Sequence, residues 1–452
     1  MSDDRSDLEA RAVGGDADAM LDLGRSAEEE GDFDTEIEWF EKAAELGDSD
    51  AMVELAEALL GAASDEGDVE NAHSWWRKAA DLGNTDALSR LGQEAESRDN
   101  IDEARSWFMR LGALDPESAG WALFRLGERV EGEGDREMAR RFYALASDFG
   151  TSDAMYRLGA IEADEGNAAE ARQLFEKAAA RGNGMAANQL GVLAAERGDV
   201  DAARQWWEPL ADAGNSWVMV QIAELVYASG DLIEAKRWAT RASVQADVGA
   251  LQLLGDISGD EGDLIAARAW HEKAAQLGSA YSMERLGTLE RDAGNDAAAH
   301  AWYEKAAEAG DSDAMFYVGL HAQDSGETAV AHDWYEKAAE AGDTDAMINL
   351  GLMIKEEGDI EAALIWWEKA VDAGDLTGMI LLGLESEGAG DVEAARAKYE
   401  EAAGAGRADA MFNVGRLADE AGDVETARVW YEKAADAGDE EAKVVLEELD
   451  DA

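Results

Sequence analysis

Apolar and polar residues alternate along this chain with a helical period, and the whole pattern repeats about every 32 residues. In residues 343–374 two apolar stripes follow one another, formed by Met347, Leu350, Gly351 and Ile354 and then by Ala363, Trp366, Trp367 and Ala370. Between them, Gly358 supplies the left-handed conformation that ends a helix, and Asp359 supplies a side-chain cap for the next one. Each repeat is therefore predicted to form two short helices joined by a tight turn.

One residue of the first stripe, which we name the marker position, identifies the same place in every repeat. It is glycine at positions 24, 92, 127, 159, 191, 255, 287, 319, 351, 383 and 415, and alanine at positions 56 and 223. The spacing is 32 from Gly127 onward, but it is 36 between Ala56 and Gly92 and 35 between Gly92 and Gly127. The string GDSDAM, present at 47–52 and again at 310–315, lies at the joint between repeats. Its glycine ends one repeat and its first Asp caps the next.

Two helices of about 12 residues are too short to be stable alone, so neighbouring repeats must stack to bury both stripes. This predicts an all-α fold, a solenoid of about thirteen helix–turn–helix repeats with a C-terminal capping helix. The predicted boundaries are 1–15 for an N-terminal cap remnant, 16–438 for the repeats (16–47, 48–83, 84–118 and then 32-residue units), and 439–452 for the capping helix. A capped array does not stack end to end, which favours a monomer.

Several features of each repeat resemble the Sel-one-like repeat, a relative of the tetratricopeptide repeat. In residues 343–374 they are Leu350-Gly351, Ala363-x-x-x-Trp367 and the ending WWEKAVDAG. Only the repeat at 48–83 has the longer turn typical of Sel-one-like units, so the array resembles a hybrid of the two tetratricopeptide-like families. The resemblance implies a right-handed α-solenoid superhelix whose first helices line a concave groove. It also implies an adaptor function, because members of these families usually hold other proteins.

Composition narrows the range of partners. The chain has 39 Lys and Arg against 101 Asp and Glu, which gives a formal net charge of −62. Such a charge repels nucleic acid and anionic membranes, and it favours basic partners or a solvent of high salt. There is no Cys, the N-terminus has no apolar stretch of the kind found in signal peptides, and no apolar run reaches the length of a membrane span. We therefore expect a cytoplasmic protein, and the charge is either functional or an adaptation for solubility or high salt.

No arrangement of residues typical of an enzyme stands in the sequence. His271-Glu272 begins an HExxH-like string, but Ala275 stands where the second zinc-binding His is needed. His300 and His332 share one position in adjacent repeats, and that position is usually basic, so we interpret them as surface residues rather than metal ligands. The sequence therefore predicts no catalytic residue, no cofactor and no metal.

A column of tryptophans runs through the second helices. Its members are Trp39, Trp75, Trp107, Trp206, Trp238, Trp270, Trp302, Trp334, Trp366 and Trp430. One interpretation is a platform on which bases or sugars stack, but the acidic charge opposes nucleic acid. We favour packing between repeats, because each Trp stands beside the buried Ala positions.

Two sets of residues on the first helices are predicted to point away from the core, toward the concave side. Arg90, Arg125 and Arg157 stand two residues before the marker position, and Leu320, Leu352 and Leu384 stand one residue after it, flanked by Phe316, Ile348, Ile380 and Phe412. The alternative for the arginines is pairing with nearby glutamates such as Glu94 or Glu128. The alternative for the flanking residues is packing in the seam between repeats. Aligned apolar residues that face away from the core favour a surface for a partner.

The repeats within 183–278 are irregular. Pro209 interrupts a second helix, Ala223 replaces the marker glycine, and Ala246 replaces the glycine that closes a repeat. A proline inside a helix loses a hydrogen bond and typically kinks the helix. Both a bend between parts of the array and a harmless local kink fit this pattern.

These features lead to one main functional hypothesis. The chain is expected to be a non-enzymatic protein–protein interaction scaffold or adaptor that binds a protein or peptide in its concave groove. The alternative is an acidic charge-mimic regulator that sequesters a basic or nucleic-acid-binding protein. Dependence on salt distinguishes the two, because screening weakens charge mimicry much more than contact with leucines.

Overall fold

The structure, a computed structural model, describes residues 2–451. All regular secondary structure in this range is α-helical, so the all-α prediction is confirmed. The chain divides into two compact units, Met1–Gly214 and Asn215–Ala452, and the division falls inside the irregular stretch 183–278. Within the described range, every helix is too short or too polar to cross a membrane.

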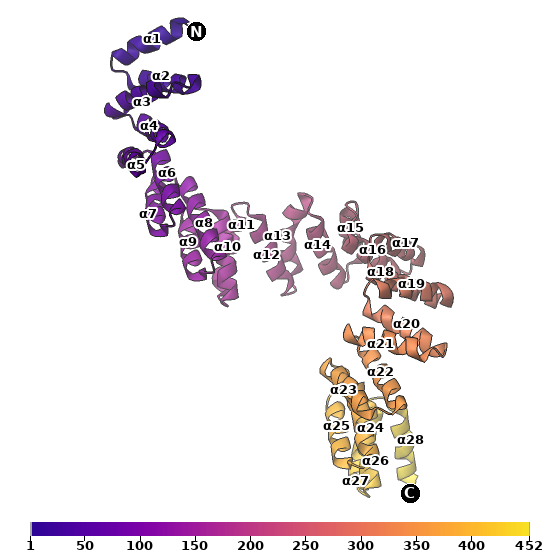
Figure 1. The fold of residues 1–452 in the computed structure, drawn as a ribbon. Coiled ribbons are helices and arrows are strands. Elements are labelled where there is room, and N and C mark those ends of the chain that lie inside the picture. The colour runs from indigo at the N-terminus through magenta and orange to yellow at the C-terminus, as the bar shows by residue number, and fades with distance from the viewer. Residues whose placement is uncertain (1, 452) are drawn as a thin grey trace. The chain divides into compact units, whose positions relative to one another are not determined.

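In the first unit, each helix packs against the next one along the chain (Figure 1). The bounds are α1 Ser2–Val13, α2 Ala17–Glu30, α3 Phe33–Glu45, α4 Ser49–Ala62, α5 Glu66–Asp81, α6 Thr85–Ser97, α7 Ile101–Gly112, α8 Pro116–Gly132, α9 Arg136–Asp148, α10 Ser152–Asp164, α11 Ala168–Ala179, α12 Gly184–Ala195 and α13 Val200–Asp212. From α2 to α27 the even-numbered helices correspond to the first helices of the predicted repeats, and the odd-numbered ones to the second helices.

The second unit continues the same alternation, again with each helix packed against its successor (Figure 1). The bounds are α14 Ser216–Ala228, α15 Leu232–Ser243, α16 Val248–Asp260, α17 Leu264–Gln276, α18 Ala280–Asp292, α19 Asp296–Glu308, α20 Ser312–Asp324, α21 Thr328–Glu340, α22 Thr344–Glu357, α23 Ile360–Asp372, α24 Thr377–Gly388, α25 Val392–Gly404, α26 Ala408–Glu420, α27 Val424–Asp436 and α28 Glu440–Asp451.

The joints between repeats form as the sequence predicts. At the second copy of GDSDAM, Gly310 follows α19 with a φ of +98°, a conformation that is strained for residues with a Cβ. Asp311 then accepts a hydrogen bond from the backbone amide of Ala314 at 2.9 Å. This bond satisfies an amide in the first turn of α20 that has no partner within the helix. The repeated string is thus a helix stop followed by a helix start.

The second stripe of each repeat is buried against the marker position. In most repeats an aromatic ring stands sixteen residues after the marker glycine and lies against it: Phe40, Phe108, Tyr143, Phe175, Trp207, His271, Tyr303, Tyr335, Trp367, Tyr399 and Tyr431. All of these rings are buried. The glycine therefore lets the two helices of a repeat approach closely enough for the ring to fill the space between them.

The tryptophan column precedes these buried rings by one residue. Most of its indoles are half-buried. Trp430, for example, packs against a core cluster to which three successive helices contribute Ile380, Tyr399 and Val414. The outer face is covered by a basic side chain three residues on, as where Lys433 Nζ lies 3.9 Å from the centroid of the Trp430 ring. These contacts support packing between repeats and leave little of the ring faces open for stacking.

The last helix covers the end of the second unit. In α28, Ala442 is buried, and Val445, Leu446 and Leu449 pack against the cluster that contains Tyr431. On its other side the helix is acidic and exposed. Residue 452, the end of the predicted capping segment, lies outside the described residues, as does residue 1 of the predicted N-terminal cap.

Candidate functional site

The three predicted leucines lie on successive first helices of the second unit. Leu320 is on α20, Leu352 on α22 and Leu384 on α24, each directly after the marker glycine of its helix. The residue exposure of Leu352 is 38% and that of Leu384 is 45%, which is high for side chains of this size. Leu320 is half-buried. Two of the three leucines thus present an open apolar surface.

The same position is polar in the repeats on either side of the leucines. It is Asp256 on α16, Thr288 on α18 and Arg416 on α26. Each of these polar groups has a partner: Asp256 accepts a hydrogen bond from Tyr281, Thr288 donates one to Glu284, and Arg416 forms an ion pair with Glu387. The apolar stripe therefore has defined ends within the second unit, and its length is three repeats.

Leu320 lines a cavity of about 350 Å³ between α18, α19 and α20. On one wall, the Tyr303 and Tyr317 rings stack with their centroids 4.7 Å apart, and the Arg291 guanidinium lies 4.8 Å above the Tyr317 ring. On another, the rings of two histidines, His300 and His321, lie 4.0 Å apart. Asp296 and Asp324 complete the lining, so the cavity combines aromatic, aliphatic, basic and acidic surface and suits the end of an amphipathic side chain.

The residues that flank the leucines occupy two kinds of place. Ile348 and Ile380 are each only 8% exposed and belong to the core clusters of the second unit. For these two residues the structure matches the alternative interpretation, packing in the seam between repeats. Phe316 and Phe412 are half-buried and lean on the ring of the next second helix, with Phe412 lying 5.4 Å from the Tyr431 ring centre. We therefore leave the two isoleucines out of the candidate surface and keep the two phenylalanines at its edge.

The predicted basic set in the first unit is exposed and paired. Arg90 forms an ion pair with Glu57 at 2.9 Å. The other two arginines make longer contacts: Arg125 lies 4.0 Å from Glu96. Arg157 lies 3.8 Å from Glu128 and 4.0 Å from Glu131. Each pair links a first helix to the first helix of the preceding repeat. Exposed pairs of this kind contribute about 0–1 kcal/mol each, so these arginines retain the capacity to change partners.

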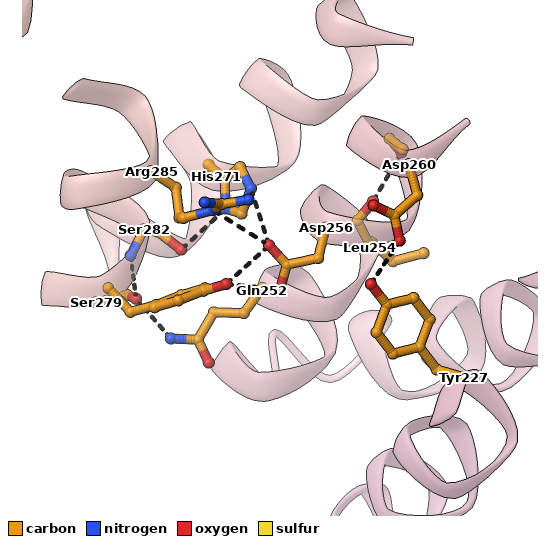
Figure 2. A network of polar contacts seen from close by, with 11 residues as sticks. Tyr227, Gln252, Leu254, Asp256, Asp260, His271, Ser279, Ser282 and Arg285 are labelled. Carbon is orange, nitrogen blue, oxygen red and sulfur yellow. Dashed lines mark hydrogen bonds and ion pairs between the residues drawn. The ribbon is translucent and has the colours of Figure 1, made fainter. Parts of the chain in front are cut away.

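A polar network of residues on α16 and α18 surrounds His271 of α17, and Figure 2 shows it from close by. Asp256 accepts hydrogen bonds from the Tyr281 hydroxyl at 2.9 and 3.0 Å and lies 3.6 Å from both Arg285 Nε and His271 Nε2. The other ring nitrogen of His271 lies 3.3 Å from the Ser282 hydroxyl. The network ties α16, α17 and α18 together.

Burial controls the protonation of this network. It lowers the pKa of His271 to about 4, with a smaller contribution from the charge of Arg285. It also raises the pKa of Asp256, against the opposing effects of the Tyr281 hydrogen bond and of Arg285. His271 is only 2% exposed and fills the position that Phe, Tyr or Trp holds in other repeats. The enclosed His271 ring thus packs where the aromatic rings of other repeats pack.

Residues 2–451 contain no group of three or more His, Cys, Asp or Glu that gathers around a point where a metal ion would sit. His300 lies 3.4 Å from Glu304, four residues on, and its ring is tilted against that of His321. The contact with His321 was not predicted, because it joins a second helix to a first helix of the next repeat.

The comparisons with known proteins give the repeat type. The Sel1 repeat profile matches residues 49–84, 122–148, 152–183, 185–215, 242–279, 280–311, 312–343 and 344–375, which together make up more than half of the chain. The chain belongs to the Sel1 repeat family. A tetratricopeptide repeat profile matches residues 7–51 and 380–442, so both ends of this Sel1 repeat chain resemble the related repeat. The resemblance stated from the sequence is thus confirmed.

Solved structures with the same kind of repeat resemble the chain. One is c5321, a protective antigen of uropathogenic Escherichia coli with an SLR fold: 24% of residues are identical, 91% of this chain and 90% of that chain are covered, and the TM-score is 0.46. Another is a Sel1 repeat protein from Oxalobacter formigenes, 25% identical, covering 66% of this chain and 93% of that one, with a TM-score of 0.47. A comparison with curated proteins found no match. Sel1 repeat proteins are generally protein-interaction scaffolds.

Proposed function

We propose that this Sel1 repeat protein is a non-enzymatic scaffold that acts as a monomer in the cytoplasm and binds a protein or peptide on the first helices of its second unit. Leu352 and Leu384 are the exposed anchors, and Leu320 with its cavity receives a further side chain of the partner. The observation that carries the proposal is the exposed leucine at one position of successive repeats, where the neighbouring repeats have polar, partnered residues. Aligned exposed apolar residues of this kind mark interaction surfaces.

The size of the surface fits a peptide or a helix of a partner. Burying a fully exposed leucine is worth about 1.5–3 kcal/mol. Leu352 and Leu384 have 38% and 45% of their surface left to cover, so together they supply about 1–2.5 kcal/mol before the ordering of the partner is counted. Phe316 and Phe412 extend the apolar area at its edges. The Arg291 and Tyr317 wall of the cavity adds polar groups that fix the orientation of the bound segment.

The test is a pair of matched double variants. Leu352→Ser with Leu384→Ser removes the anchors, and Ile360→Ser with Val392→Ser removes residues of 44% and 49% exposure at the starts of α23 and α25. Exposed substitutions usually cost under ~0.5 kcal/mol each, so both proteins should melt within a few degrees of the parent. The first variant should lose the partners that the parent captures from native lysate, and the second should keep them.

Two results would contradict the proposal. If the first variant unfolds, the leucines belong to the core. If it folds and still captures the same partners, the binding surface lies elsewhere, and charge reversal of Arg90, Arg125 and Arg157 becomes the next experiment. Adding Leu320→Ser to the double variant then measures the contribution of the cavity.

The net charge of −62 supports a second candidate, an acidic charge mimic that sequesters a basic or nucleic-acid-binding protein. The Debye length falls from about 10 Å at 0.1 M salt to about 3 Å at 1 M, so charge mimicry should weaken steeply over this range. Binding to the leucine surface should change little. A salt titration of the captured complex decides between the two.

A further inference from the structure

Glu36 occupies a position that is alanine in all the other repeats. The position lies twelve residues after the marker in regular repeats, where it is filled for example by Ala139, Ala203, Ala331 and Ala363, all of which are fully buried. A carboxylate at a place where the array otherwise demands the smallest apolar side chain costs stability unless it has a partner. The first repeat therefore departs from the rest at one buried residue.

Among residues 5–449, no hydrogen-bond or ion-pair partner reaches the carboxylate of Glu36. Glu36 is only 5% exposed, and its Oε2 atom is buried without a hydrogen bond. It lies on α3 at the wall of a cavity of about 440 Å³, whose apolar lining includes Phe33, Ile37 and Ala58. An unpaired carboxylate that is nine-tenths buried and borders an open cavity indicates that something outside the chain completes the site.

The charges around the cavity are only partly balanced. Glu54 forms an ion pair with Arg25 at 2.7 Å, and Glu57 forms one with Arg90 at 2.9 Å. Glu28 also lines the cavity, and within residues 5–449 neither it nor Glu36 has an ion-pair partner. Burial raises the pKa of Glu36, and the charges of Glu28 and Glu54 raise it further. The cavity thus holds more negative charge than the chain neutralises.

The excess negative charge favours a cation as the ligand, and the shape and lining of the cavity indicate which kind of cation. The carboxylates do not gather at a single point in a way that would hold a metal ion, at least among the described residues. The apolar lining suits an alkyl stem that leads to a charged end. An ammonium is a compact charge on a flexible four-carbon stem, and it needs fewer acceptors than a guanidinium. Glu54 and Glu57 are already paired with arginines of the chain, so few carboxylate oxygens are left to accept hydrogen bonds from a ligand. This favours the ammonium.

We infer that the cavity between α2, α3 and α4 binds a lysine side chain of a partner protein, with the ammonium between Glu36 and Glu28 and the stem along Phe33, Ile37 and Ala58. This site lies in the first unit, so it does not depend on the leucine surface of the second unit. Its chemistry requires a protonated amine on an apolar stem and excludes the same side chain once it is acetylated, because acetylation removes the charge.

The test titrates the full chain with the peptide Ac-Gly-Gly-Lys-Gly-Gly-NH₂ by calorimetry at 0.15 M salt. The acetyllysine form of the peptide is the ligand control. Glu36→Gln removes the charge with little change of shape, and Glu29→Gln makes the same charge change at an exposed position of α2. We expect Glu36→Gln to weaken lysine-peptide binding at least tenfold, Glu29→Gln to leave it within twofold, and the acetylated peptide not to bind.

A second measurement separates a binding role from a structural one. Glu36→Ala restores the residue found in the other repeats and removes the unpaired carboxylate, so the melting temperature should rise while lysine-peptide binding is lost. A fall in melting temperature, or equal binding by Glu36→Gln and the parent, would overturn the inference. So would tighter binding of the same peptide with Arg in place of Lys, which would assign the cavity to a guanidinium, or tighter binding of free 1,5-diaminopentane, which would assign it to a small-molecule amine.

Discussion

The ring of Tyr335 on α21 lies directly over the α-carbon of Gly319 on α20, so close that a Cβ built on Gly319 would stand 2.8 Å from the ring atom Cδ1. The same relationship, at the same spacing of sixteen residues, recurs between the markers and the rings of most repeats. The one regular repeat without a marker glycine has Ala223 there, and sixteen residues on it has Ala239 in place of the ring. Both alanines are buried, so a larger marker is matched by a smaller partner.

This relationship predicts the effect of filling the marker. Gly319→Ala should lower the stability by about 1–3 kcal/mol, because the added methyl group overlaps the Tyr335 ring in a packed core. Gly259→Ala is the control, since a Cβ at that helical glycine meets nothing within 4 Å and replacing glycine in a helix gains about 0.5–1 kcal/mol. Chemical denaturation measures both. Equal shifts in the two variants would show that the close approach carries no cost.

Changing both residues tests whether they are coupled. Tyr335→Ala alone should lower the stability by about 3–5 kcal/mol, because it leaves a cavity where the aromatic ring was. Gly319→Ala with Tyr335→Ala reproduces the arrangement of Ala223 and Ala239, so its loss should be smaller than the sum of the two single losses. A strictly additive double variant would mean that the two positions act independently.

The stability of the protein should depend on pH through His271. Its pKa in the folded protein is about 4, below the ordinary value of 6.5, because the ring is buried. Protonation therefore favours unfolding: the stabilisation is complete above about pH 6.5 and is lost as the pH falls toward 4, by an amount on the order of 3 kcal/mol.

The variant His271→Phe isolates this contribution, since Phe cannot titrate and an aromatic ring suits the position. As the pH falls from 7 to 4, the unfolding midpoint of the parent should fall more than that of the variant. Between pH 7 and 8 the difference between the two proteins should stay constant. A difference that does not change over the acidic range would show that His271 is protonated in the folded state.

Glu162 on α10 provides a buried counterpart to the surface ion pairs. Its side chain is 1% exposed, and it accepts hydrogen bonds from Asn167 at 2.7 Å and from Arg140 at 2.8 Å. Burial alone would raise the pKa of Glu162, but these two bonds and the charge of Arg140 together outweigh it and hold the pKa below its ordinary value. Arg140→Met should therefore cost on the order of 2–3 kcal/mol, less than a fully buried pair because the Arg140 side chain is 37% exposed.

The matched control is Arg172→Met at the same position of the next repeat. The side chain of its partner Glu176 is 42% exposed and lies four residues away on the same helix, so the loss should stay below ~0.5 kcal/mol. Thermal melts of both variants measure the contrast. Similar losses would mean that burial of the glutamate does not matter.

The last helix is expected to protect the end of the second unit. Replacing Val445, Leu446 and Leu449 together by Ser removes the contacts of α28 with the cluster around Tyr431. The protein should then melt earlier and aggregate, because the open end of the last repeat is exposed. Val444→Ser, at a residue of 56% exposure in the same helix, should have no such effect. Light scattering during a thermal ramp reports both properties.

Local chemistry along the chain was enough to determine the helices, the joints and the buried stripes. A glycine that adopts positive φ and an Asp that caps the next helix act over a few residues, so the joint at Gly310 and Asp311 is readable without any neighbour. The helical period places the rings of residues such as Tyr335 on the buried side, whatever packs against them. The terminal helix and the absence of strands within residues 2–451 follow from the same local rules.

What each side chain meets was decided only by the tertiary structure. The helical period places Leu320, Leu352 and Leu384 on the same side of their helices, yet Leu320 lines a cavity while the other two are exposed. The difference arises because Arg291 of α18 and His300 and Tyr303 of α19 supply walls around Leu320, and these walls belong to neighbouring helices rather than to the leucine's own helix. Glu36 is the same case. Its place in an alanine position is visible in the sequence, but whether it has a partner depends on three helices that the fold brings together.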